Sequence, residues 1–160
     1  KPIGIEKFSF WGIDFKEYLK DGLYECYFGN RRSKKNIQIS GEFINGKRNG
    51  VFKYYYTPKR GIFSKPQLST LINYKDGIID GYFASFYPNG VKIIEGFINN
   101  GKLDGFFIER EIMYISKKKV KKDFISCIYL YKDGNLVCKE SYGINENFNK
   151  TFCTDDLDKN

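Results

Sequence analysis

One phrase of the sequence returns at a near-regular interval, and it limits the folds that this chain can adopt. It reads Gly-Glu-Phe-Ile-Asn-Gly-Lys-Arg-Asn-Gly-Val-Phe over residues 41–52, and it returns as Gly-Phe-Ile-Asn-Asn-Gly-Lys-Leu-Asp-Gly-Phe-Phe over residues 96–107. A degenerate copy lies between them over residues 74–83, and weaker echoes stand at Asp21-Gly22 and Asp133-Gly134. Such repetition indicates a stack of small units, which offers a surface for binding but no sign of a catalytic cleft.

The turn of each unit is the most specific part of the phrase. Asn-Gly or Asp-Gly between runs of Phe, Tyr, Ile and Val indicates a β-hairpin, because a type I′ turn needs positive φ at both central residues. The five such glycines, at 22, 46, 77, 101 and 134, are 24, 31, 24 and 33 residues apart. The basic unit therefore has 24 residues, and two of the four intervals are longer, by 7 and by 9 residues. We place these additions in long loops at 57–70 and around 116–122. The fold class is therefore all-β: an antiparallel meander of about five hairpins forming one open, elongated sheet.

A second glycine follows the turn glycine by four residues in the three best copies, and phenylalanine stands two residues further on. Glycine inside a strand permits close approach by another group, so we expect an aromatic ring over each second glycine. Cys26 and Cys138 take this place in the first and last units, as is typical of units that cap a stack. The structural residues of the repeat are Gly46, Gly50, Phe52, Gly77, Gly81, Phe83, Gly101, Gly105 and Phe107.

The pattern Gly-x-Phe-x-Asn-Gly-Lys-x-x-Gly-x-Phe, with Phe-Tyr-Pro-Asn-Gly at 86–90 as the second turn of a unit, resembles the MORN repeat. It looks most like the bacterial variant found in YwqK-type proteins, which are described as antitoxin components. The resemblance covers roughly residues 18–142 and is strongest over 41–107. It implies a non-catalytic module tied to protein scaffolding and, in some eukaryotic cases, to membrane phospholipids.

The chain divides accordingly into an N-terminal cap segment, the hairpin repeats and an acidic tail. The cap segment is 1–17, the repeats are 18–142 with turns at 21–22, 45–46, 76–77, 100–101 and 133–134, and the tail is 143–160. The tail either caps the array, frays in solvent, or folds its acidic residues back onto basic ones. The segment 107–115 could form a helical turn, but its place in the repeat predicts a strand.

The net charge of +8 is predicted to be polarised by the topology. Successive turns of a meander fall on opposite edges of the sheet, so the Asn-Gly and Asp-Gly turns share one rim and the other loops share the second. Loops at 29–36, 57–70, 88–92 and 116–122 hold 13 of the 27 basic residues and no acidic residue. The rim of turns is nearly balanced, with Lys20, Lys47, Arg48, Lys75, Lys102 and Lys132 against Asp21, Asp76, Asp80, Asp104 and Asp133. The 13 basic residues of the loops either solvate mobile loops or attract an anionic partner: Arg31, Arg32, Lys34, Lys35, Lys59, Arg60, Lys65, Lys92, Lys117, Lys118, Lys119, Lys121 and Lys122.

The four cysteines do not form a Cys-x-x-Cys pair, so we expect no zinc site. If Asp133-Gly134 is a two-residue turn, Cys138 lies opposite Tyr129 and Cys127 lies opposite Glu140. That diagonal placement fits a disulfide poorly. We expect buried free thiols, no metal and no cofactor.

An enzyme is not expected, because the chain has no histidine and no Gly-rich phosphate loop. Asp80 and Asp104 recur at the same place before the second glycine, where Asn49 also stands, so they are predicted to stabilise turns.

The predicted function is that of a repeat scaffold that binds a protein partner, with an antitoxin or immunity role toward an acidic partner as its sharpest form. The alternative is peripheral attachment to an anionic membrane through the basic loops. Nucleic acid is a third reading, which we rank lower because the tyrosines at 54–56 recur at repeat spacing and are expected to pack in the sheet. Unpaired strands at the two ends of an open array could also drive oligomerisation.

The compartment stays open. The first residue is Lys1, which indicates removal of either a secretory leader or an expression tag. No apolar run approaches the roughly 18 residues of a membrane span, so we expect a soluble chain, either cytoplasmic or exported.

Overall fold

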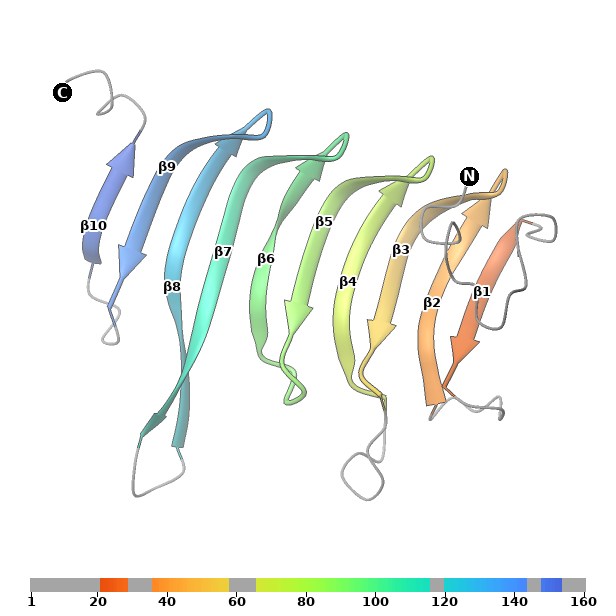
Figure 1. The fold of residues 1–160 in the computed structure, drawn as a ribbon, viewed down its shortest axis with the longest axis horizontal. Helices are drawn as coiled ribbons and strands as arrows, with labels where there is room; N and C mark the ends of the chain where they lie inside the picture. The colour runs from red at the N-terminus through yellow and green to blue at the C-terminus, as the bar shows by residue number, and fades with distance from the viewer. Residues whose placement is uncertain (1–20, 29–35, 58–65, 116–119, 144–147, 154–160) are drawn as a thin grey trace.

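The computed structural model describes residues 21–28, 36–57, 66–115, 120–143 and 148–153. These residues form a single sheet in which ten strands follow one another in chain order, each antiparallel to the next (Figure 1). Within the described ranges there is no helix, and hence none with the length and apolarity needed to cross a membrane. The predicted all-β hairpin meander in one open sheet is confirmed.

The strands have similar lengths, apart from a long pair near the C-terminal side. The segment 107–115, for which a helical turn was the alternative, belongs to a strand as predicted. Two predicted loops are shorter than expected, because strands begin at Leu68 and at Val120. The bounds are β1 Gly22–Tyr27, β2 Ile37–Ile44, β3 Lys47–Tyr55, β4 Leu68–Lys75, β5 Ile78–Phe86, β6 Lys92–Asn99, β7 Lys102–Ile115, β8 Val120–Lys132, β9 Asn135–Tyr142 and β10 Phe148–Cys153.

Four type I′ turns line one rim of the sheet (Figure 1). In each, the Asn or Asp has φ of 48–52° and the following glycine has φ of 69–87°. The turns are also bonded to one another: the Gly77 amide donates to the Arg48 carbonyl oxygen over 2.9 Å, and the equivalent bonds from Gly101 and Gly134 are 2.9 and 2.8 Å. Asp21 stands just before β1, which begins at Gly22, and the Asp21 carboxylate accepts a hydrogen bond from the Asn45 amide over 2.5 Å.

The second glycine of each unit forms a β-bulge. Between Glu42↔Asn49 and Ser40↔Lys53, three residues of β3 face the single residue Gly41 of β2. The same count of three against one recurs in the β4–β5 and β6–β7 pairs. Gly50 is the first of the three bulge residues, and Gly81 and Gly105 are the second. Their φ values of 73°, 105° and 93° lie in a region that favours glycine.

The prediction of an aromatic ring over each second glycine is wrong. A Cβ added at Gly50 or Gly105 would meet no atom within 4 Å, and at Gly81 it would meet only the Asn73 side chain. The rings lie instead over the first glycine of the phrase, which is Gly41 beneath Phe52 and Gly96 beneath Phe83. Close approach and positive φ are therefore required at different glycines.

The two faces of the sheet differ in burial. Directly opposed residues of an antiparallel pair share a face, and side chains alternate along each strand. Phe43, Phe52 and Tyr74 are buried together on one face, which we call the ladder face. The other is called the open face, because six of the seven large apolar residues that are exposed in the described ranges lie on it by register: Leu23, Ile44, Val51, Ile78, Phe97 and Phe106.

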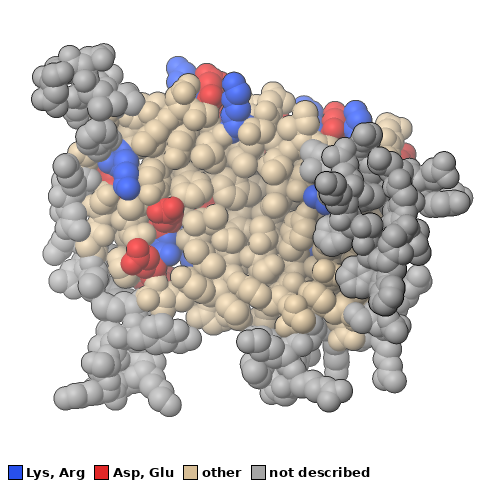
Figure 2. All heavy atoms as spheres, viewed as in Figure 1, with Lys and Arg blue, Asp and Glu red and all other residues tan. Residues whose placement is uncertain are grey.

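Charge on the visible surface gathers at the rim of turns (Figure 2). Positive and negative side chains lie side by side there, and a few more of both signs lie toward the C-terminal side of the sheet. The centre of the visible face is nearly free of Lys, Arg, Asp and Glu. The mixed signs at the rim agree with the near balance read from the sequence, with one exception: Arg48, counted there among the rim charges, is buried.

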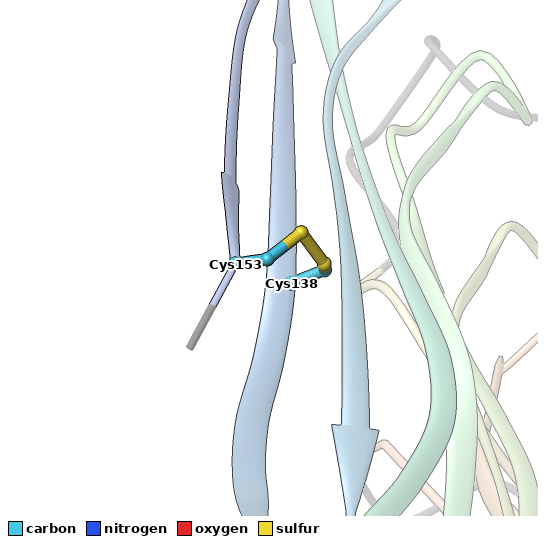
Figure 3. The surroundings of a disulfide bond; sticks show 2 residues. All are labelled: Cys138 and Cys153. Atoms are coloured by element: carbon cyan, nitrogen blue, oxygen red, sulfur yellow. A yellow bond between two sulfur atoms is a disulfide. The ribbon is translucent and has the colours of Figure 1, made fainter. Parts of the chain in front are cut away.

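A disulfide joins the last two strands, since Cys138 of β9 is bonded to Cys153 of β10 (Figure 3). The prediction of buried free thiols is wrong for these two residues. It is also wrong in part for the others, because Cys26 is a free but exposed thiol and Cys127 a free, half-buried one. The tail thus contributes a tenth strand over 148–153, and its acidic residues from 155 onward lie outside the described residues.

The cysteine prediction was wrong because it assumed another register for the β8–β9 hairpin. Cys138 pairs with Leu130 rather than Tyr129, and Cys127 pairs with Ser141 rather than Glu140, because a bulge follows the Tyr131↔Leu136 pair. This bulge adds one residue, whereas the bulges at the second glycines of the three regular units add two. Cys138 is therefore turned to the open face, directly opposite Cys153.

Two glycine positions should respond to substitution in opposite ways. Gly41→Ala places a Cβ 2.4 Å from the Phe52 ring, so we expect a loss of about 1–3 kcal/mol in the free energy of unfolding. Gly50→Ala meets open space but strains a positive φ, at a cost of about 1–2 kcal/mol. Asparagine should recover much of the loss at 50 and none at 41. Urea unfolding measures all four variants; equal effects of asparagine at the two sites would contradict the assignment.

Removing the disulfide should destabilise the C-terminal edge. The two cysteines are 15 residues apart, for which chain entropy predicts about 3 kcal/mol. We expect the Cys138→Ser/Cys153→Ser variant to lose roughly that amount and to exchange the β9 and β10 amides faster in hydrogen-exchange mass spectrometry. Cys127→Ser, which removes a free thiol, is the control and should change stability by less than about 1 kcal/mol. Unchanged hydrogen exchange in β10 would show that the backbone hydrogen bonds to β9 hold this strand without the disulfide.

Candidate functional site

The ladder face is held together by aromatic rings that meet edge to face. Tyr24, Phe43, Phe52 and Tyr74 come from four successive strands, with ring centroids 5.2, 5.5 and 5.2 Å apart. Such pairs contribute about 0.5–1.5 kcal/mol each beyond their buried area. A second group of rings continues this face toward the C-terminal side: Phe83, Phe107 and Tyr129.

Arg48 is the one charged residue buried in the described part of the chain, with 7% of its surface exposed. Its guanidinium carbon lies 5.0 and 5.1 Å from the ring centroids of Phe52 and Tyr74, within cation–π range. Its Nη1 donates hydrogen bonds to the Tyr54 and Tyr74 hydroxyls, each over 2.9 Å. The sheet thus encloses a cation among aromatic side chains.

The Tyr54 hydroxyl supplies no negative charge to Arg48. Burial, and next the hydrogen bond with Tyr74, raise the pKa of Tyr54 well above its ordinary value of 10.0, so this phenol stays protonated. The Nε atom of Arg48 is buried without a hydrogen-bond partner. Among the described residues, no carboxylate forms an ion pair with it.

The open face carries an apolar row that crosses the strands at the level of the bulges. Leu23 is 74% exposed, Phe106 59% and Phe97 53%, and Val51 is also exposed. The Phe97 ring packs on Tyr82, the residue opposite it, at 5.5 Å between centroids. Glu42, opposite Leu23, and Asn73, opposite Val51, interrupt this row. Phe97 and Phe106 lie on neighbouring strands, and grouped exposed apolar side chains mark interaction sites more often than scattered single residues do.

A charged cluster lies on the same face beside the row. Glu95 accepts hydrogen bonds from Tyr82 over 2.6 Å and from Lys92 over 2.7 Å, and it pairs with Arg110 over 2.5 Å. Burial alone would raise the pKa of Glu95, but the hydrogen bonds from Lys92, Tyr82 and Arg110 outweigh it and lower the pKa from 4.5 to about 2. The cluster ties β5, β6 and β7 together.

A hollow of about 300 Å³ adjoins this cluster through Arg110. Its walls are mixed, with apolar side chains beside one cation and one carboxylate. No described group of three or more His, Cys, Asp or Glu side chains is arranged to hold a metal ion. The hollow is lined by Arg110, Asp123, Phe124, Ile125, Ile128 and Tyr142.

Most of the predicted basic residues lie outside the described residues. That holds for ten of the thirteen: Arg31, Arg32, Lys34, Lys35, Lys59, Arg60, Lys65, Lys117, Lys118 and Lys119. Lys121 and Lys122 fall within strand β8 rather than in a loop, and Lys92 begins β6 and pairs with Glu95. The basic rim therefore stays a prediction.

Comparison with known proteins matched no family model, no curated protein and no solved structure. The resemblance of the phrase to the MORN repeat and to YwqK-type proteins thus stays a prediction. The two aspartates that were predicted to stabilise turns contact turn residues: Asp80 accepts a hydrogen bond from the Asn100 amide over 3.2 Å, and Asp104 accepts one from the Asn99 side chain over 3.3 Å.

The sequence reading missed Arg48 and the open-face row. The number of residues after the turn glycine could have identified both features. Arg48 stands two residues after Gly46, whereas Val51 and Phe106 stand five residues after Gly46 and Gly101. Counting along the strand assigns these positions to opposite faces.

Glu95→Gln should change stability in a pH-dependent way. The folded-state pKa is lowered from 4.5 to about 2, so the ionised carboxylate stabilises the fold above about pH 4.5, and this contribution is lost as the pH falls toward 2. We expect the variant to be about 1–3 kcal/mol less stable at pH 7 and nearly equal to wild type near pH 2. Denaturant unfolding across this range measures it. Glu42→Gln, at an exposed position on the same face, is the control; a constant gap for Glu95→Gln would contradict the assignment.

Proposed function

We propose that this chain is a non-catalytic repeat scaffold that binds a protein partner. The observation that carries the proposal is the open face, where large apolar side chains stand exposed in a row beside a charged cluster. Burial of apolar area drives most protein association, and aromatic residues dominate the energetics of interfaces. A rigid sheet presents such residues with little entropy to lose on binding.

The sharpest form of this proposal is an antitoxin-like or immunity-like role toward an acidic protein. It is supported by the net charge of +8 and by the repeated phrase with its resemblance to YwqK-type proteins. An acidic partner fits a basic chain better than a basic one, because complementary charge speeds association and excludes like-charged partners. Rescue of growth by co-expression with the toxin of a neighbouring gene would test this form directly.

Peripheral attachment to an anionic membrane is the second candidate. It is favoured by the 13 basic residues predicted for one rim, each of which would contribute about 1 kcal/mol near an anionic surface. Sedimentation with vesicles that contain phosphatidylglycerol, compared with neutral vesicles, separates this candidate from the first. Equal binding to both kinds of vesicle would count against it.

Truncation of the exposed aromatic side chains should abolish partner binding without unfolding the sheet. We expect Phe97→Ser/Phe106→Ser to weaken binding of a recovered partner at least tenfold, which corresponds to about 1.4 kcal/mol, with wild-type circular dichroism. Leu136→Ser is the matched control, since Leu136 is exposed but paired with Tyr131 of the ladder face. Biolayer interferometry measures the affinities. Binding that is insensitive to the double variant would remove the open face as the interface.

A further inference from the structure

We propose that the disulfide between Cys138 and Cys153 is a redox switch that controls docking on the open face. The oxidised chain binds its protein partner, and reduction of this bond to two thiols weakens the binding. The inference rests on the proposed protein-binding function and adds the regulation of that function. It also gives the docking surface a definite place, over strands β5 to β10.

The first argument is that the disulfide ends an apolar row on the open face. Phe106 of β7 pairs with Leu130 of β8, and Leu130 pairs with Cys138 of β9. Cys138 in turn pairs with Cys153 of β10. Directly opposed residues lie on one face with their Cβ atoms about 4.5–5.5 Å apart. The exposed ring of Phe106 is thus followed by a half-buried leucine and then by the disulfide, with no polar residue between them.

The row continues on the other side of Phe106. Phe97 of β6 faces the three bulge residues that end at Phe106, and its ring packs on Tyr82 of β5 at 5.5 Å between centroids. The row therefore crosses six successive strands, β5 to β10. At about 4.8 Å between neighbouring strands, its length is about 24 Å. That length is comparable with the width of a standard protein interface, which covers about 800 Å² on each partner.

The second argument is the local irregularity that places Cys138 in this row. Leu136 pairs with Tyr131 on the ladder face, so an unbroken alternation would place Cys138 on the ladder face as well. The one-residue bulge between these two positions turns Cys138 to the open face instead. Here it meets Cys153, and the disulfide lies on one side of the sheet (Figure 3). The departure from the regular repeat thus joins the covalent bond to the docking surface.

The third argument is how β10 is held. Within the described ranges β10 pairs with β9 alone, and the register of this pair shifts between Phe148 and Lys150. A terminal strand of six residues with one neighbour is the kind of element that opens locally before the rest of a fold. The disulfide joins residues that are 15 apart in sequence and so restricts the opened chain. Reduction removes this restriction, so β10 opens more often and the row loses its last member.

The switch operates by thiol–disulfide exchange with a dithiol reductant. A thiolate of the reductant attacks one sulfur of the disulfide, the S–S bond breaks, and the other cysteine leaves as a thiolate that takes up a proton. The second thiol of the reductant then displaces the first cysteine from the mixed disulfide. The chain has gained two electrons and two protons, and the reductant has become a disulfide. Cys138 and Cys153 are half-buried rather than enclosed, so they are partly open to such a reagent.

The two free thiols are placed away from this exchange. Cys127 stands two residues before Tyr129 in a regular part of β8, so it lies on the ladder face. Cys26 belongs to β1, at the other end of the sheet (Figure 1). Within one chain the Cys138–Cys153 pair therefore has two states, a disulfide or two thiols.

The test compares binding to the open face in the two redox states. The probe is a fluorescein-labelled peptide selected from a cysteine-free phage library on the oxidised chain, after removal of phages that bind Phe97→Ser/Phe106→Ser. This counter-selection restricts the peptide to the open face. We expect reduction by dithiothreitol to weaken its binding at least fivefold in fluorescence anisotropy, and reoxidation to restore it. Equal affinity in the two states would overturn the switch.

Two variants identify the bond that responds. Cys138→Ser/Cys153→Ser should bind the peptide as weakly as the reduced wild type and should not respond to dithiothreitol. Cys26→Ser/Cys127→Ser is the matched control, because it loses two thiols but keeps the disulfide, and it should respond as the wild type does. A response that persists in the first variant, or that is lost in the second, would overturn the assignment.

Hydrogen exchange separates the switch from general unfolding. Reduction should speed amide exchange in β9 and β10 and leave β5 to β8 unchanged, because the row over those strands rests on its own sheet. Faster exchange in β5 to β8 as well would overturn the switch, since loss of binding would then follow from loss of the fold.

Failure here is distinguishable from failure of the proposed function. A peptide that binds both redox states equally overturns the switch and leaves the docking surface standing. A selection that yields no peptide dependent on Phe97 and Phe106 removes the docking surface itself, and the switch with it.

Discussion

Positive φ at three positions in a hairpin is the constraint on which the rest of this structure depends. Two positions form the type I′ turn and the third lies in the bulge, as at Asn45, Gly46 and Gly50. Most residues lose roughly 1–2 kcal/mol in this region, whereas glycine does not and asparagine and aspartate tolerate it. The turn sets the twist that lets each hairpin lie against the last, and the bonded turn amides then hold the hairpins in line.

The bulges determine which side chains share a face. An insertion of two residues preserves the alternation of side chains, so Arg48 before the bulge and Phe52 after it lie on the same face. In the last full hairpin the second glycine is replaced by Cys138 and the insertion is one residue. The alternation then breaks, and Cys138 is turned to the open face, where it meets Cys153. The loss of one glycine thus accompanies the covalent closure of this edge.

The features that depend on neighbouring residues could be predicted from the sequence, whereas those that depend on contacts between distant strands could not. Turn dipeptides and alternating aromatic residues predicted the hairpins, their order and the strand over 107–115. The disulfide could not be predicted, because it depends on a one-residue bulge and on β10, which no Asn-Gly or Asp-Gly dipeptide precedes. Arg48 was counted as a rim charge because burial depends on rings from other strands. The basic residues predicted as a binding rim are mostly outside the described residues, so that part of the reading is neither supported nor opposed.

The unequal faces of the sheet follow from its single layer. Rings from neighbouring strands can cover one another on the ladder face, since Gly41 and Gly96 leave room for Phe52 and Phe83 to lie flat. On the open face the residue five places after the turn glycine lies within a bulge, where the strand bends away from its neighbour. It is Val51, Tyr82 and Phe106 in the three regular units. Tyr82 is half-buried and bonded to Glu95 within the sheet, whereas Val51 and Phe106 are exposed; the proposed protein-binding face rests on these exposed apolar positions.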